Sequence, residues 1–94
     1  MTLRWSKIAL EDLQNIHEFI TQDDPSQADK FIDALIGSAQ QLELFPLSGR
    51  SVPEYDHPAI REIIYSSYRI IYRIDDDRVE IVTVLHGARI LPVE

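Results

Sequence analysis

The chain has 94 residues, no cysteine, and a formal net charge of −7 from nine lysines and arginines against sixteen aspartates and glutamates. This length fits one domain, which we expect to span residues 1–94. The lack of cysteine excludes disulfide frameworks and thiolate metal sites, and the acidic balance argues against indiscriminate nucleic-acid binding. We find no apolar stretch typical of a signal peptide or a membrane span, so we expect a cytoplasmic protein without a membrane partner.

The N-terminal part of the chain is predicted to form a short strand and then a helix. Residues 2–5 suit a strand, and Ser6 is placed to cap the helix that follows. Apolar side chains then recur at helical spacing from Ala9 to Ile20, with polar residues between them. This pattern predicts an amphipathic helix over about residues 7–22.

A second helix is expected over about residues 25–44. Asp24 is the expected N-cap, Pro25 the first helical residue, and Gln27 the third-position partner of a capping box. An apolar stripe begins at Ala28 and continues at helical spacing. The short connection makes the two helices an antiparallel hairpin.

The C-terminal part is predicted to contain three strands. Runs rich in β-branched and aromatic residues cover 60–65, 68–74 and 78–86. Ser66 and Ser67 separate the first two runs, and three aspartates separate the last two, so both gaps fit hairpins. These aspartates lack the twelve-residue spacing of a calcium loop, and we expect neither a metal site nor a cofactor.

The predicted fold class is α+β, in the order β-α-α-β-β-β. The segment 51–59 contains two prolines and is expected to be a loop. The last three strands have no helices between them, so their sheet should be antiparallel. The helical hairpin should pack on one face of this small sheet and leave the other face at least partly open.

The two-residue gap also predicts the register of the first strand hairpin. With Ser66 and Ser67 as the loop, the more apolar face carries Ile63, Tyr65, Tyr68, Ile70, Tyr72 and Ile74. We assign this face to the helices, so Arg69 and Arg73 project from the open face with Glu62 near both. These charges form either a cross-strand ion-pair cluster or a guanidinium patch. A register shift of one residue would exchange the two faces.

Every base after Leu47 is an arginine. The set consists of Arg50, Arg61, Arg69, Arg73, Arg78 and Arg89. The planar guanidinium binds carboxylates and phosphates in a bidentate way that lysine does not. Two interpretations stay open: surface charge that suits a sheet, or contacts with one shared anionic partner.

Several segments, taken in order, resemble one known family. They are Trp5, ALEDLQNIHEFI at 9–20, DPSQADKFIDAL at 24–35, LELFPLSGRSVPE at 42–54, REIIYSSYRIIYRI at 61–74 and VEIVTVLHGAR at 79–89. Together they cover nearly the whole chain, and they resemble the ParE/RelE superfamily of bacterial type II toxin–antitoxin toxins.

The resemblance implies a helical hairpin on a small antiparallel sheet and a role in growth inhibition and plasmid stabilisation. It also implies a cognate antitoxin that wraps the toxin, giving a hetero-oligomer. RelE-like toxins cleave mRNA on the ribosome, as metal-independent endoribonucleases. ParE-like toxins instead stall DNA gyrase.

The RelE-like site, as the resemblance implies it, maps onto Arg61 and Arg89, with Arg50 in a loop where other basic residues occur. The two former arginines would stabilise the charge on the phosphate, and His86 would transfer protons. The alternative for His86 is a strand-end residue that bonds a backbone carbonyl, and no second proton-transfer group is evident.

Departures from the RelE-like pattern favour the ParE-like branch. RelE-like nucleases tend to be strongly basic, whereas this chain is acidic and has no lysine after Lys30 and no tyrosine after Tyr72. The residues expected to contact the target or antitoxin are then Arg50, Arg61, Arg69, Arg73 and Arg89. A third hypothesis is an inactive family member that still binds an antitoxin.

Overall fold

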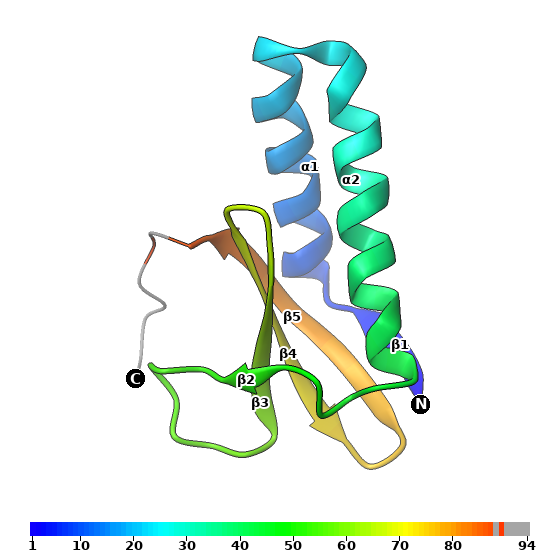
Figure 1. The fold of residues 1–94 in the computed structure, drawn as a ribbon, viewed down its shortest axis with the longest axis vertical. Helices are drawn as coiled ribbons and strands as arrows, with labels where there is room; N and C mark the ends of the chain where they lie inside the picture. Colours follow the sequence, from blue (N-terminus) through cyan, green and yellow to red (C-terminus); the bar gives the residue numbers. More distant parts are fainter. Residues whose placement is uncertain (88, 90–94) are drawn as a thin grey trace.

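The computed structural model describes residues 1–87 and 89. In chain order the elements are β1 (Thr2–Trp5), α1 (Lys7–Asp23), α2 (Pro25–Gln40), the short 3-10 helix η1 (Gln41–Glu43), β2 (Arg50–Ser51), β3 (Ile60–Tyr65), β4 (Tyr68–Asp75) and β5 (Arg78–His86). The five strands form one sheet in the order β1-β5-β4-β3-β2, with the helical hairpin on one face (Figure 1). The predicted α+β fold class is confirmed.

The sheet differs from the expectation at its two edges. β1 pairs with β5 in parallel, so the sheet is mixed. The long connection between these two strands, which contains both helices and β2 to β4, gives the chain the length to return in the same direction. At the other edge, Arg50 and Ser51 pair with Glu62 and Arg61 and form β2, inside a region that we expected to lack strands. The three C-terminal strands are antiparallel, as predicted.

The helix starts agree with the sequence except in one cap. Ser6 caps α1, and its Oγ accepts a hydrogen bond from the Ala9 backbone N–H at 3.0 Å. Asp24 is the N-cap of α2 and Pro25 its first residue, but Asp24 makes no side-chain cap bond. The predicted capping box is therefore wrong, because the Asp24 carboxylate accepts instead from the Ser26 hydroxyl at 2.7 Å.

The predicted hairpin register is confirmed at every pair. Tyr65 pairs with Tyr68, and the ladder continues to Ile60 opposite Arg73. Ser66 supplies the left-handed conformation of the turn, with a φ of 55°. The side chains that the register assigned to the helices do pack in the core or against it.

A β-bulge at Val82 lets β5 contribute to the core on both sides of an irregularity. Tyr72 pairs with Ile81, whereas Ile71 pairs with Thr83, so Val82 is an extra residue on β5. Ile81 and Val84 are consequently both buried under the helices, although strict alternation would place them on opposite faces.

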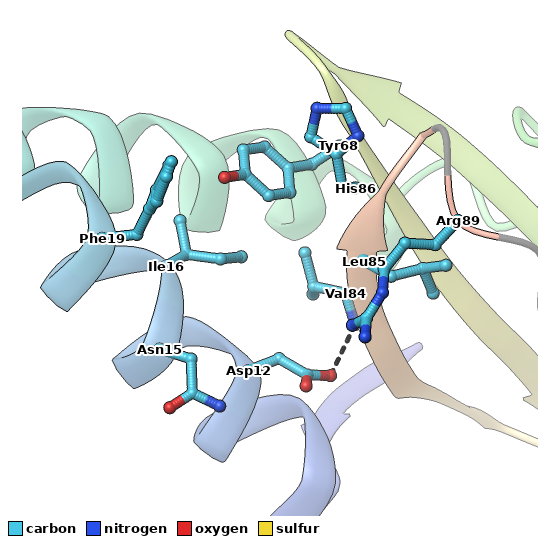
Figure 2. A pocket seen from close by; sticks show the side chains of 9 residues that line it. All are labelled: Asp12, Asn15, Ile16, Phe19, Tyr68, Val84, Leu85, His86 and Arg89. Carbon is cyan, nitrogen blue, oxygen red and sulfur yellow. Dashed lines mark hydrogen bonds between the residues drawn. The ribbon is translucent and has the colours of Figure 1, made fainter.

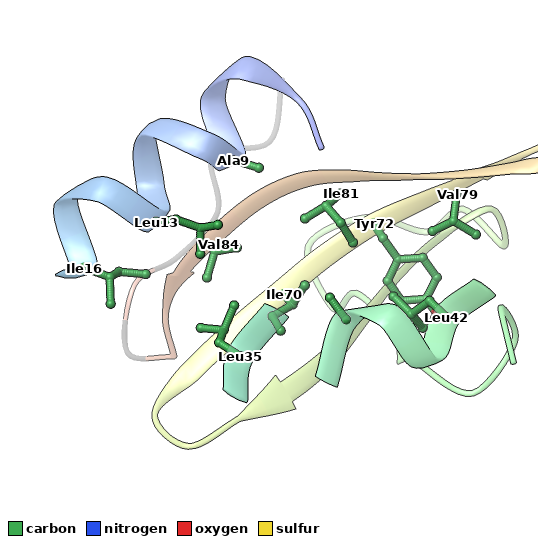
Figure 3. Packing of buried hydrophobic residues seen from close by; sticks show 11 residues of the cluster. Ala9, Leu13, Ile16, Leu35, Leu42, Ile70, Tyr72, Val79, Ile81 and Val84 are labelled. Atoms are coloured by element: carbon green, nitrogen blue, oxygen red, sulfur yellow. The ribbon is translucent and has the colours of Figure 1, made fainter. Parts of the chain in front are cut away.

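The core lies between the helical hairpin and the sheet (Figure 3). Its buried members are Ala9, Leu13, Ile16, Leu35, Ala39, Leu42, Ile70, Tyr72, Val79, Ile81 and Val84. All but the Tyr72 hydroxyl are apolar, which is the arrangement expected for a face covered by amphipathic helices. Within residues 1–87 and 89, neither helix is long and apolar enough to cross a membrane.

The opposite face of the sheet is partly covered by the segment 52–59, and we call it the loop-side face. Val52 and Ile71 are each only 1% exposed, and Tyr55 lines a small hollow with Ile71. Glu62, on the same face, is also 1% exposed. The expected open face is therefore a second, thinner layer, in which charged groups are buried.

Candidate functional site

Arg69 is the centre of a buried ion-pair network on the loop-side face. Its Nη1 and Nη2 atoms donate to the two Glu54 carboxylate oxygens at 2.8 Å each, and its Nε donates to Glu62 Oε1 at 2.8 Å. The hydrogen bonds to Glu54 do most to raise the pKa of Arg69 above its ordinary value; burial opposes them and Glu62 adds to them. Arg69 therefore joins segment 52–59 to the sheet.

Arg50 approaches the same buried carboxylate from solvent. Its Nε donates to Glu62 Oε2 at 2.7 Å, while 65% of its side chain stays exposed. Glu62 thus receives hydrogen bonds from two arginines, one buried and one at the surface. Of the two ion pairs, only the one with Arg50 presents a cation to solvent.

Arg61 lies on the helix-side face of β3 and holds a loop. It pairs with Tyr72 across the strands, donates from Nη1 to the Gly49 carbonyl at 3.0 Å, and donates from Nε to the Pro58 carbonyl at 3.2 Å. The Tyr72 hydroxyl donates to the Pro46 carbonyl at 2.7 Å and accepts from the Gly49 N–H at 3.0 Å. Arg61 and Tyr72 together fix the chain that leads into β2.

The remaining two predicted arginines lie apart from this group. Arg73 is exposed on the loop-side face, and its Nη2 lies 3.4 Å from Glu80 Oε1. Arg89 is exposed after the end of β5, and its carbonyl accepts from Arg69 at 3.3 Å. The five arginines are thus divided between both faces of the sheet and the end of β5, and their binding roles stay predictions.

A cleft of about 280 Å³ lies between α1 and the end of β5 (Figure 2). It is lined by Asp12, Asn15, Ile16, Phe19, Tyr68, Val84, Leu85, His86 and Arg89. Phe19 is a large apolar side chain that is 61% exposed, and the rings of Tyr68 and His86 meet edge to face at 5.6 Å. The cleft therefore combines apolar walls with polar groups at its rim, as ligand and peptide sites do.

Asp12 closes the strand edge inside this cleft. β1 pairs with β5 only as far as Ile81, so the next residues of β5 have no strand beside them on that side. The Asp12 carboxylate accepts from the Val84 N–H at 2.9 Å and from the Thr83 hydroxyl at 2.6 Å. An aspartate from α1 thus satisfies the backbone where the sheet edge would otherwise be open.

The residues proposed for a ribonuclease site do not meet in one place. His86 and Arg89 line the cleft, which lies beside the Tyr65 end of β3, whereas Arg61 is the second residue of β3. Tyr68 is the strand partner of His86 and Tyr72 that of Arg61. Arg61 and His86 are therefore four residues apart along the strands and two strands apart across the sheet. This places their Cα atoms roughly 16 Å from each other.

The other histidines have local partners. His17 Nε2 lies 2.7 Å from Asp29 Oδ1 on the exposed surface of the helical hairpin, and His57 Nδ1 accepts from the Ala59 N–H at 3.1 Å. Within the described part of the chain, no group of three His, Asp or Glu residues is placed to hold a metal ion.

Sequence reasoning missed three residues that shape these sites. In the sequence, Asp12 is only one of the polar residues of an amphipathic helix, Phe19 lies outside the apolar stripe, and Glu54 belongs to a segment that is expected to be a loop. Of these three residues, only Phe19 could have been found from the sequence. It lies one residue outside the apolar stripe, which indicates an exposed apolar side chain. The partners of both acids come from residues distant in the chain.

Comparison with known proteins identifies the family. Residues 3–91 match the model described as ParE toxin of type II toxin-antitoxin system, parDE. The chain is also 34% identical over 87 residues to the protein named "Putative toxin Y4kP" from Sinorhizobium fredii (strain NBRC 101917 / NGR234), covering 90% of this chain and 86% of that protein.

Two solved structures share the fold. One is from the chromosomal ParDE system of P. aeruginosa, with a TM-score of 0.78, 19% identity, and coverage of 92% of this chain and 95% of that chain. The other is from the toxin–antitoxin complex RelBE2 of Mycobacterium tuberculosis, with a TM-score of 0.65, 25% identity, and coverage of 90% and 95%. Because the family model spans nearly the whole sequence, the chain belongs to the ParE toxin family of type II toxin–antitoxin systems.

Proposed function

We propose that this toxin inhibits growth by binding a large protein target, with DNA gyrase the favoured target, and that a cognate antitoxin neutralises it. The observation that carries the proposal is the separation of Arg61 from His86 and Arg89. A ribonuclease needs its proton-transfer group and its phosphate-stabilising cations around one scissile bond. Here Arg61 is instead used to hold two backbone carbonyls.

The charge distribution supports the same proposal. Arg69 is neutralised by two glutamates and is almost fully buried, and Arg73 lies beside Glu80. Neither therefore adds an unpaired cation for contacts with ribosomal RNA. With a net charge of −7, the protein as a whole would be repelled by RNA phosphates.

The cleft between α1 and β5 is the site that we propose for the antitoxin. It is concave and largely apolar, and the exposed Phe19 ring stands at its wall (Figure 2). An amphipathic segment of the antitoxin would lay its apolar side chains against Phe19 and Ile16. The test is Phe19→Asp, which should abolish co-purification with the antitoxin encoded beside the toxin gene and leave the melting temperature within a few degrees.

The target is tested by expressing the toxin from a tightly repressed promoter and following two readouts after induction. Intact mRNA with filamentation and an induced DNA damage response supports gyrase as the target. Rapid cleavage of mRNA that depends on translation would contradict it and favour the RelE-type endoribonuclease. No growth defect would favour the inactive, antitoxin-binding family member.

The same assay tests the predicted arginines. Arg61→Ala and Arg89→Ala should each abolish toxicity without loss of the fold, as checked by circular dichroism and thermal unfolding. Arg78→Ala is the matched control, since Arg78 is exposed at the first position of β5 and has no assigned role. Full toxicity in a folded Arg61→Ala, Arg89→Ala double variant would remove both of these residues from the toxic mechanism.

A further inference from the structure

Three large apolar side chains are exposed within four consecutive residues between η1 and β2. Leu44 is 78% exposed, Phe45 62% and Leu47 67%. Single exposed apolar residues are ordinary on protein surfaces, but a contiguous group of this kind marks a contact site. We call residues 44–47 the apolar loop.

The backbone of the apolar loop is held in one conformation at both ends. The N–H groups of Leu44 and Phe45 both donate to the Gln41 carbonyl, at 3.1 and 2.9 Å, and the Ser48 N–H donates to the Phe45 carbonyl at 3.1 Å. The Tyr72 hydroxyl reaches the Pro46 carbonyl at 2.7 Å from inside the core. The side chains are thus presented to solvent on a rigid support, which lowers the entropy cost of binding.

Gly49 shows how closely this support is packed. A Cβ atom at this position would lie 2.7 Å from the Glu62 carbonyl oxygen and would also collide with the Tyr72 hydroxyl. Arg61 donates to the Gly49 carbonyl on the other side. Position 49 therefore has no space for a side chain, and only glycine fits where the chain enters β2.

Arg50, which follows directly, places an oriented cation beside the apolar loop. Its Nε is anchored on the buried Glu62 carboxylate, and 65% of its side chain is exposed. An anchored guanidinium can bind a carboxylate through its terminal amino groups with little loss of side-chain freedom. The apolar loop and Arg50 together have the composition of a protein interface, apolar at the centre and charged at the rim.

We propose that the apolar loop and Arg50 form the surface that the toxin inserts into its protein target, at an apolar cleft bordered by a carboxylate. This inference rests on the proposed function and names the part of the toxin that carries it out. A group of exposed apolar side chains on a hydrogen-bonded loop suits a folded partner with a preformed cleft. The carboxylate is required by charge complementarity with Arg50.

The position of the apolar loop separates this surface from the proposed antitoxin site. Leu42, just before the loop, packs with Tyr72 and Val79 at one end of the core, whereas Ile16 and Val84 of the cleft lie at the other end (Figure 3). A wrapping antitoxin segment suits the concave cleft, and a folded target suits the exposed apolar loop. The two partners thus have distinct primary contacts on this chain, although Arg89, which lines the cleft, is also predicted to be needed for toxicity.

The test compares a Phe45→Ala, Leu47→Ala double variant and an Arg50→Gln variant with the wild type. The control is an Ile8→Ala, Leu10→Ala double variant, which removes apolar side chains that are 60% and 52% exposed on α1. Growth inhibition after induction is measured first, and binding to purified DNA gyrase second. Circular dichroism and thermal unfolding verify that every variant folds.

We expect the Phe45→Ala, Leu47→Ala double variant to lose toxicity and to bind gyrase at least ~10-fold more weakly, a loss typical of central interface residues. Arg50→Gln should weaken binding by a smaller factor, and the control should match the wild type. If the wild type is toxic but does not bind gyrase, and the loop variants lose toxicity, the apolar loop is the target surface and the target is a protein other than gyrase.

The inference and the proposed function fail in different ways. Full toxicity and unchanged gyrase binding in folded loop variants would overturn the inference and leave the proposed function standing. A wild type that neither inhibits growth nor binds gyrase would overturn both.

Discussion

The two faces of the sheet are built from alternate residues of the same strands, yet one buries mainly apolar side chains and the other buries an ion pair. The helix-side face buries aliphatic side chains and Tyr72 under α1 and α2. The loop-side face buries Arg69 and Glu62 under a segment that contains two prolines. The difference arises because amphipathic helices supply apolar side chains with a regular spacing, whereas an irregular segment supplies few, so hydrogen-bonded charges attach it to the sheet.

The comparison also shows which face can change without loss of the fold. Apolar burial is the main favourable term in folding, whereas a buried ion pair offsets most of its attraction by the cost of desolvation. The helix-side face should therefore determine whether the protein folds. The loop-side face should determine how segment 52–59 and Arg50 are placed.

The largest effect is expected from Leu35→Asp on the helix-side face. Leu35 is fully buried, and an unpaired carboxylate there costs more than a domain of this size can lose. Circular dichroism should show no cooperative unfolding transition. Leu44→Asp, at a side chain that is 78% exposed, is the control and should keep the wild-type melting curve. A cooperative transition near the wild-type temperature in the Leu35 variant would contradict the assigned core.

Glu62→Ala should produce the next largest effect, on the loop-side face. The substitution leaves Arg69 paired with Glu54 alone and removes the carboxylate that holds Arg50. It should lower the free energy of unfolding by about 3 kcal/mol, the lower end of the range for breaking a buried ion pair. The measurement is denaturant unfolding. Added salt should change this loss little, because the pair is shielded from the ions. A loss below about 1 kcal/mol would show that the network contributes no more than a surface pair.

Tyr72→Phe tests the hydroxyl group that lies in the helix-side core. It leaves the buried Gly49 N–H without its acceptor and should cost about 1–3 kcal/mol at neutral pH. Burial does most to raise the pKa of Tyr72, against the hydrogen bond from Gly49 and the charge of Arg61. The neutral phenol is thus favoured in the folded state.

Because the pKa of Tyr72 is raised in the folded state, the neutral phenol stabilises the fold fully below the unfolded-state pKa of about 10. This stabilisation is lost as the pH rises through the folded-state pKa. Melting temperatures between pH 8 and pH 11 should therefore fall less steeply for Tyr72→Phe than for the wild type. Parallel pH profiles for the two proteins would contradict a buried, neutral Tyr72. Tyr55→Phe, on the loop-side face, is the matched control.

The smallest effect is expected from Arg73→Ala. Its contact with Glu80 is 3.4 Å long and exposed, and such pairs contribute about 0–1 kcal/mol. Denaturant unfolding at low and high salt should show a small loss that disappears when the charges are screened. A loss as large as that of Glu62→Ala would end the distinction between buried and exposed pairs on this face.

Sequence patterns predicted the helix-side face well because its information is local and periodic. The apolar stripes of α1 and α2, the Ser66–Ser67 turn and the alternation in β3 and β4 each act over a few residues, and each was confirmed. The bulge at Val82 was not predicted, since it becomes visible only when β5 is paired with β4. The role of Asp12 depends on the same edge of β5.

The candidate sites were predicted less well for a related reason. The expected arginines were chosen by residue type, but their use depends on the nearest carboxylates in space. Glu54 and Glu62 neutralise Arg69, backbone carbonyls occupy Arg61, and Arg50 keeps most of its guanidinium in solvent. The hairpin register did predict Glu62 near Arg69, and that ion pair is confirmed. The contacts of Arg69 with Glu54, of Arg61 with Gly49 and of Arg50 with Glu62 could not be predicted, because each joins residues at least twelve positions apart.

The sequence alone determined the fold class, the two helices, the hairpin register and the family resemblance, because periodic burial and short turns are properties of neighbouring residues. Only the tertiary structure decided which arginines are buried, where the cleft lies, and that the apolar loop is held rigid. Those properties depend on distances between segments far apart in the chain, and the free energy of a charge depends on what surrounds it.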